Sequence, residues 1–165
     1  MYNRPDAVIL YVTRLKSMPR NDSTMRPSFA ALWIRTLTKS DLHSLIDDVK
    51  RGDPDATSRA TVFVAAESFG MWHNRARANL CRYFKNHPPS DGECKRMVDA
   101  IVNRLTDGRF SEQFKDQLSM AIRFDPDRMA EAVTIASSSE RGYIRRYADW
   151  VRHALDSSST IPNGG

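Results

Sequence analysis

Helix-start signals recur along this chain, and they constrain its fold more than any other sequence feature. Asp-Pro-Asp occurs at residues 53–55 and again at residues 125–127. In each copy the first aspartate can accept hydrogen bonds from free backbone N–H groups, and proline suits the first helical position. Ser90 and Glu93 have the spacing of a capping box, in which each side chain satisfies the other residue's backbone N–H. These signals predict helices that begin just after Asp53, Ser90 and Asp125.

Apolar residues between these signals repeat at helical spacing. Leu42, Leu45, Ile46 and Val49 are one example, in a helix that we expect over Asp41–Lys50 with Ser40 as its cap. The chain has no alternating runs of β-branched residues, and no hairpin turn lies between such runs. The sequence therefore predicts an all-α fold, a helical bundle or pair of small packed bundles with about eight helices.

The helix boundaries also suggest how the chain divides. A chain of 165 residues suits one domain, or two small bundles that share a core. His87-Pro88-Pro89 ends the helix expected over Trp72–Asn86. We therefore expect an N-terminal bundle at residues 1–88, a C-terminal bundle at 89–156 and a flexible tail at 157–165.

Positive charge is concentrated in three segments. Residues 71–88 carry four cations and no carboxylate, residues 141–155 carry four arginines and one aspartate, and residues 1–39 carry seven cations and two aspartates. Residues 40–70 and 89–140 each sum to −3. Clustered cations attract a phosphate backbone, so this pattern favours nucleic-acid binding. A solvated face, paired with acids of neighbouring helices, is the plainer alternative.

Arginine is the side chain best suited to bidentate phosphate contacts, so arginines are the candidate binding residues. The helix after Gly70 and the last helix, at about Glu140–Leu155, present them along one side. The loop after Lys16 and the helix expected over Ser28–Leu37 add three more. The candidate nucleic-acid ligands are Arg20, Arg26, Arg35, Arg75, Arg77, Arg82, Arg141, Arg145, Arg146 and Arg152.

Other chemistries have little support in the sequence. Cys81 and Cys94 form no CxxC pair, and with His73 and His87 they match no familiar zinc pattern, so we expect free thiols, no metal and no cofactor. We find no nucleophile elbow or glycine-rich phosphate loop, and the prediction is a protein that is not an enzyme. The three tryptophans are expected to pack in the core, with base stacking by one of them a minor alternative.

The N-terminal apolar run at residues 7–12 is too short for a membrane span and lacks a signal-peptide cleavage site. We therefore expect a cytoplasmic protein without a membrane partner.

Three segments carry a resemblance to a known family: Leu10–Arg26, Leu42–His73 and Phe124–Arg152. In order, length and helix character they resemble the small subunit (CasB family) of type I-E CRISPR Cascade complexes. The resemblance implies a non-catalytic subunit, usually in two copies, that lies against other protein subunits. It would brace the guide–target duplex formed by crRNA and target DNA, and help to hold the displaced DNA strand.

Two further hypotheses stay open. Residues 53–84 and 125–155 resemble each other at an offset of 72, with Asp53, Gly70 and Ala76 matching their counterparts. A HEAT-like helical repeat that grips an acidic protein partner would explain this similarity. The other hypothesis is a helical glycosylase-like enzyme, in which Asp149 beside Trp150 would do the chemistry.

Overall fold

All regular structure in the described part of the chain is helical. The computed structural model describes residues 32–159. A short helical turn at residues 32–36 comes first. Seven helices follow it within the described range: α3 (Lys39–Lys50), α4 (Pro54–Ala65), α5 (Met71–Asn86), α6 (Asp91–Asp107), α7 (Phe114–Phe124), α8 (Pro126–Ser137) and α9 (Gly142–Ser159). The prediction of an all-α fold is confirmed for these residues.

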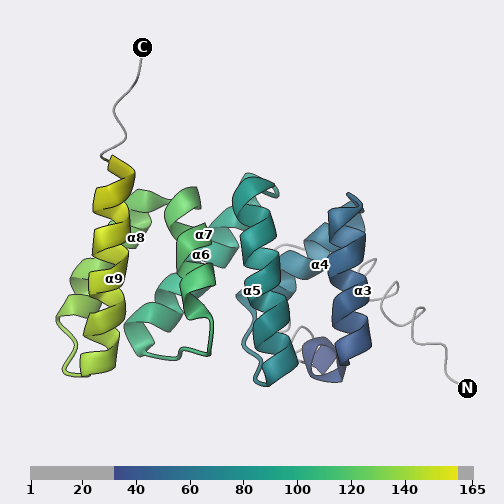
Figure 1. Cartoon of the computed structure of the whole chain (residues 1–165), viewed down its shortest axis with the longest axis horizontal. Helices are drawn as coiled ribbons and strands as arrows, with labels where there is room; N and C mark the ends of the chain where they lie inside the picture. Colours follow the sequence, from purple (N-terminus) through teal and green to yellow (C-terminus); the bar gives the residue numbers. More distant parts are fainter. Residues whose placement is uncertain (1–31, 160–165) are drawn as a thin grey trace, which may run out of the picture.

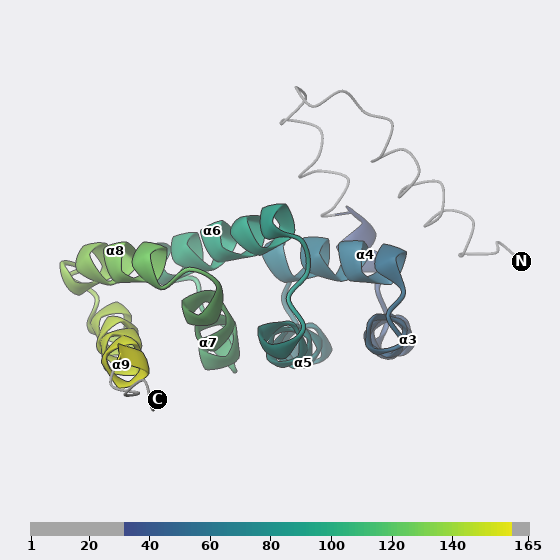
Figure 2. The same ribbon diagram turned by 90° about the horizontal axis from the view of Figure 1, so that it is seen from above.

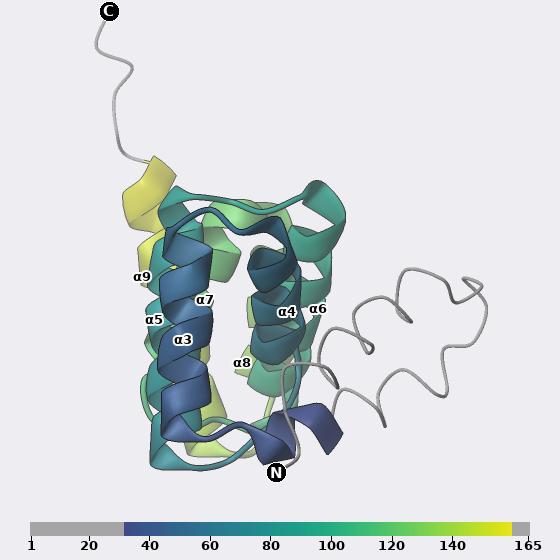
Figure 3. The same cartoon turned by 90° about the vertical axis from the view of Figure 1, so that its right-hand side faces the viewer.

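Successive helices alternate between two layers. Figures 1 and 2 show α3, α5, α7 and α9 in one row, which we call the odd layer, and α4, α6 and α8 in a second row, the even layer. Viewed from the end in Figure 3, the two rows stand face to face. Each helix packs against its neighbours in the row and against the facing helices. The molecule is therefore a row of helical hairpins.

The two segments that resemble each other at an offset of 72 residues lie two hairpins apart in this row. α4 and α8 occupy the even layer, and α5 and α9 occupy the odd layer (Figure 2). Asp53 and Asp125 both cap their helices through the side chain, and a proline begins each helix. Ala76 and Ala148 are both buried. The two similar segments thus form hairpins at corresponding places in the two layers, with α6 and α7 as the hairpin between them.

The local start and stop signals account for most helix ends. The caps at Asp53, Ser90 and Asp125 form as predicted. The cap of α3 is different: Thr38 accepts the backbone N–H of Asp41 in a capping box, so the prediction of Ser40 as the cap is wrong. α4 ends at Ala65.

Residues beyond the expected last helix belong to α9, which continues to Ser159. This corrects the predicted start of the tail at residue 157. The remainder of the tail lies outside the described residues.

A single cluster of buried apolar side chains runs between the layers. Its largest members include Phe63 of α4, Phe84 of α5 and Phe114 of α7. Across residue 88, α4 packs against α6 and α5 packs against α7. The predicted bundles at 1–88 and 89–156 therefore share one core over the described residues.

Two arginines are buried in this core, at the point where α4 ends. Arg77 is 3% exposed and Arg104 is 5% exposed. Arg104 donates hydrogen bonds to the carbonyl oxygens of Val64, Ala65 and Ala66. The last carbonyls of a helix have no intrahelical donor and carry partial negative charge, so the guanidinium satisfies them and is stabilised by them.

Arg77 reaches the same turn from α5. It donates to the carbonyl oxygens of Phe63 and Ala66 and to the Ser68 hydroxyl, at 3.4, 3.1 and 2.6 Å. Burial, together with the charge of Arg104, lowers the pKa of Arg77 to about 10, which leaves it protonated at neutral pH. These two side chains fix the chain between α4 and α5, and hence the position at which α5 begins.

Candidate nucleic-acid interface

Charge is divided between the two layers. Within the bounds of its helices, the odd layer has a net formal charge of +5: α5 contributes +4, α7 and α9 +1 each, and α3 −1. The even layer has −2, because α4 is neutral and α6 and α8 are each −1. Among the helices that the structure describes, the net positive charge therefore lies in the odd layer.

α5 contributes most of this charge, although not with every predicted residue. Arg75, Arg82 and Lys85 are exposed. Arg82 approaches Asp116 of α7 at 3.7 Å, and because the guanidinium is 60% exposed this ion pair is weak and open to competition.

Arg77, which the sequence placed among the phosphate ligands, is buried and donates to the end of α4 and to Ser68, so that assignment is wrong. The physical reason is that α5 packs against α3, α4 and α7 together, which buries a wider arc than a single apolar face.

The arginines at the start of α9 fold back on neighbouring backbone. Arg141 donates to the carbonyl oxygen of Asp107 and to the Tyr143 hydroxyl, and Arg145 donates to the carbonyl oxygens of Ser139 and Glu140. Both side chains remain exposed and have no carboxylate partner among the described residues. Their positive charge is therefore not neutralised.

The other two arginines of α9 differ from each other. Arg152 pairs with Asp149 and donates to the Ser137 hydroxyl, so it faces α8. Arg146 is exposed, with no hydrogen bond or ion pair to another described residue. Trp150, beside Asp149, packs against the core, with the ammonium of Lys115 at 5.5 Å from its ring centroid.

The arginines of α5 and α9 do not meet in one patch. α7 lies between the two helices in the odd layer (Figure 1). Arg35 is exposed in the turn at residues 32–36, before α3. Arg20 and Arg26 lie outside the described residues. The exposed arginines of α5 and α9 are thus distributed along the odd layer.

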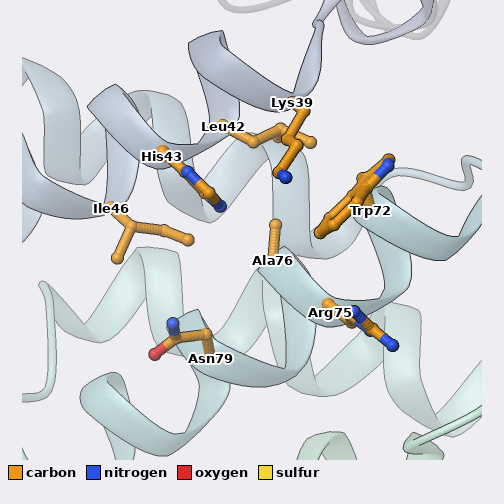
Figure 4. Close-up of a pocket in the computed structure, with 8 residues that line it drawn as sticks. All are labelled: Lys39, Leu42, His43, Ile46, Trp72, Arg75, Ala76 and Asn79. Atoms are coloured by element: carbon orange, nitrogen blue, oxygen red, sulfur yellow. The ribbon is translucent and has the colours of Figure 1, made fainter.

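A cavity of about 100 Å³ opens between α3 and α5 in this layer. Figure 4 shows the side chains around it. It is lined by Lys39, Leu42, His43, Ile46, Trp72, Arg75, Ala76 and Asn79. Lys39 and Arg75 carry positive charge and no lining residue is acidic, so the cavity is electropositive.

Trp72 stands at the centre of this basic cluster. Its ring lies 4.0 Å from the Lys39 ammonium and 5.3 Å from the Arg75 guanidinium carbon, measured to the ring centroid. His43 meets the ring edge-on at 6.4 Å. Trp72 is 36% exposed, whereas Trp33 and Trp150 pack against the core. The prediction that all three tryptophans are core residues is therefore wrong for Trp72.

Sequence reasoning missed Lys39, His43, Trp72 and Asn79 as site residues. One signal was available: Phe69, Met71 and Trp72 place more apolar surface around the start of α5 than the core uses. Phe69 is 84% exposed and Met71 is 53% exposed. The pairing of α3 with α5, which brings Lys39 to Trp72, has no local signature.

Neither a cluster of metal ligands nor a membrane-spanning helix is present among the described residues. Over residues 32–159, no three His, Cys, Asp or Glu side chains gather as a metal site would require. No helix in this range combines the length and the apolar character needed to cross a bilayer.

No known protein family, curated protein or solved structure matches the chain.

Proposed function

We propose that this chain is a non-catalytic module that binds nucleic acid through the phosphate backbone, with the odd layer as its binding side. The observation that carries the proposal is the division of charge: with the buried Arg77 and Arg104 left out, the helices of the odd layer carry +4 and those of the even layer −3. Lysine and arginine on one side of a protein release counterions from a polyanion when they neutralise its phosphates. The affinity of such binding falls steeply as salt is added, and it depends little on the nucleotide sequence.

The identity of the complex to which this chain would belong is a more specific proposal, and it rests on the sequence resemblance alone. A small subunit of a CRISPR RNA-guided surveillance complex would place the odd layer against the guide–target duplex and the displaced strand. Guide RNA would read the sequence, and this chain would supply backbone contacts in a cytoplasmic ribonucleoprotein with other subunits. Co-purification of the tagged chain with RNA of a fixed length tests this assignment, and its absence would leave only the general binding activity.

The binding proposal is tested with a fluorescent single-stranded oligonucleotide titrated at several salt concentrations. The double variant Arg75→Gln/Lys85→Gln removes two charges from the odd layer. Lys95→Gln/Arg96→Gln is its matched control, because these two cations are exposed on α6 of the even layer. Each lost phosphate contact to a single strand lowers the slope of log K against log salt by about 0.7.

We expect the first variant to lower that slope by about 1.4 and the control to leave it near the wild-type value. Equal losses in both variants would mean that net charge, and not the odd layer, carries the binding. Affinity that is independent of salt would overturn the proposal.

A second function has one observation in its favour. The row of helical hairpins, with α4–α5 and α8–α9 as equivalent units, is the arrangement expected of a HEAT-like module that grips an acidic protein. Poly-glutamate distinguishes the two. If it displaces the oligonucleotide as well as an equal charge of unlabelled oligonucleotide does, an acidic protein becomes the better candidate ligand.

A further inference from the structure

The cavity between α3 and α5 has a composition that general phosphate binding does not require. A surface that only neutralises phosphates needs cations, and this cavity adds an aromatic ring and an amide. Lys39 and Arg75 approach the Trp72 ring, and Asn79 lines the same cavity one helical turn beyond Arg75 (Figure 4). An electropositive groove with an aromatic platform is the pattern by which proteins hold single strands.

We propose that this cavity, with Trp72 at its mouth, holds one nucleotide unit of a single strand. The phosphate would lie between the Lys39 ammonium and the Arg75 guanidinium, and the base would stack on the indole of Trp72. This inference rests on the proposed function and specifies its ligand as a strand with unpaired bases. It also makes the α3–α5 end of the odd layer the principal contact.

The charge environment supports a phosphate at this position. Neither Lys39 nor Arg75 has a carboxylate partner among the described residues, and no acidic side chain lines the cavity. Asp41, on the first turn of α3, is engaged by the backbone N–H and hydroxyl of Thr38. Both cations thus lie near the Trp72 ring without an acidic partner among the described residues, an arrangement that a phosphate would stabilise.

The cations that now lie over the Trp72 ring can be replaced there by a base. A cation over an exposed aromatic ring is weakly held, because water competes for the charge. A phosphate placed between Lys39 and Arg75 would draw both cations toward itself and uncover the ring. A base has a π-face and can then occupy the same position without regard to its identity.

The volume limits what the cavity can enclose. About 100 Å³ is well below the size of pockets that bury a whole small-molecule ligand. A phosphate group can enter, while a base must remain at the mouth. The site therefore suits a strand that passes over the surface, and it does not suit an enclosed free nucleotide.

The experiment compares two single strands of equal length and charge, one with bases and one with abasic sugars throughout, and titrates both by competition. For the wild-type chain we expect the strand with bases to bind more tightly by about 5- to 150-fold, the range that aromatic stacking contributes per base. Trp72→Ala should abolish this preference, because no ring is left on which the bases can stack. Trp72→Phe should restore part of it, because phenylalanine also stacks.

Two controls separate stacking from general damage. Phe69→Ala removes a more exposed aromatic ring just before α5 and should keep the preference. Lys39→Gln should lower the affinity for the two strands by the same factor. Circular dichroism and the melting temperature report whether Trp72→Ala is folded.

The outcomes also distinguish this inference from the function on which it rests. Equal wild-type affinity for both strands would overturn the nucleotide site and leave phosphate binding by the odd layer intact. Loss of the preference in Phe69→Ala but not in Trp72→Ala would overturn it as well. Failure of the wild-type chain to bind either strand would contradict the proposed function itself.

Discussion

Arg77 of α5 and Arg104 of α6 both donate a hydrogen bond to the carbonyl oxygen of Ala66, at 3.1 and 2.7 Å. Two guanidinium groups from different helices therefore meet at the carboxyl end of a third helix, α4. Their charges are compensated by backbone carbonyls, and Glu67 nearby is paired with Arg109 instead. This contact connects α4, α5 and α6 in both layers.

Replacement of Arg104 by methionine should destabilise the protein by about 3 kcal/mol, because the carbonyls of Val64 and Ala65 lose this donor and that of Ala66 keeps only Arg77. Urea denaturation followed by circular dichroism measures the change. Arg96→Met, on the exposed side of the same helix, should alter the free energy of unfolding by no more than about 0.5 kcal/mol. Equal effects of the two substitutions would contradict a structural role for Arg104.

Stability should decline in alkaline solution through Cys81. Burial raises the pKa of this thiol from 9.0 to about 12. In the unfolded chain the thiol ionises near pH 9 while the folded protein keeps it protonated, so rising pH favours unfolding by up to about 1.4 kcal/mol per pH unit. Its contribution is complete below the unfolded pKa and is lost as the pH rises toward the folded one.

Unfolding free energies at about pH 8, 9 and 10 test this expectation, and Cys81→Ala should show a shallower decline than the wild type. The window ends near pH 10 because Arg77, whose pKa is lowered to about 10, acts in the opposite direction above it. Identical slopes for the two proteins would show that Cys81 is not responsible.

A side chain at Gly108 should be destabilising. It adopts a φ of +72° after α6, and a Cβ atom there would lie 2.7 Å from Cδ1 of Ile144 and 2.8 Å from the Tyr143 hydroxyl oxygen. Gly108→Ala should therefore cost about 2 to 4 kcal/mol, from backbone strain and overpacking against α9 together.

Gly52→Ala is the matched control, because Gly52 has a φ of +85° but nothing within 4 Å of the added atom. It should cost only the strain, about 1 kcal/mol. Thermal denaturation compares the two variants. A Gly108 variant that is as stable as the Gly52 variant would mean that α9 can move away from this position.

The aspartate caps should contribute about 1 kcal/mol each. Asp53 accepts the backbone N–H groups of Asp55 and Ala56, and Asp125 accepts that of Arg128. Alanine at either position should lower the free energy of unfolding by this amount, and asparagine, which also caps, should restore most of it. Loss of stability in Asp125→Asn equal to that in Asp125→Ala would assign the effect to charge and not to capping.

The sequence was sufficient where structure depends on neighbours in the chain. Asp53-Pro54 and Ser90 with Glu93 form the caps they predict, since a cap involves only residues within one turn. Thr38 was missed because Thr38 and Ser40 are both good caps, and only the pairing with Asp41 distinguishes them. The all-α fold follows from the same local signals.

The candidate site was less predictable because its residues are placed by lateral packing. On a single-helix projection Trp72 belongs to the apolar arc of α5 and Arg77 to the basic arc. In the assembled layers the two change roles: Arg77 is buried against the end of α4, and Trp72 lies at the surface beside α3. Which neighbours a helix has in its row is a long-range property that periodicity does not contain.

The unequal charge of the two layers gives the molecule a permanent dipole moment across its thickness. In the field of a long polyanion such a molecule experiences a torque before any contact forms, so that its cationic side turns forward during diffusion. Added salt should then slow association more than it hastens release, because screening removes the orienting field at a distance and leaves close contacts less affected. The alternation of helices between layers thus determines both the surface with which the protein binds and its orientation as it approaches a polyanion.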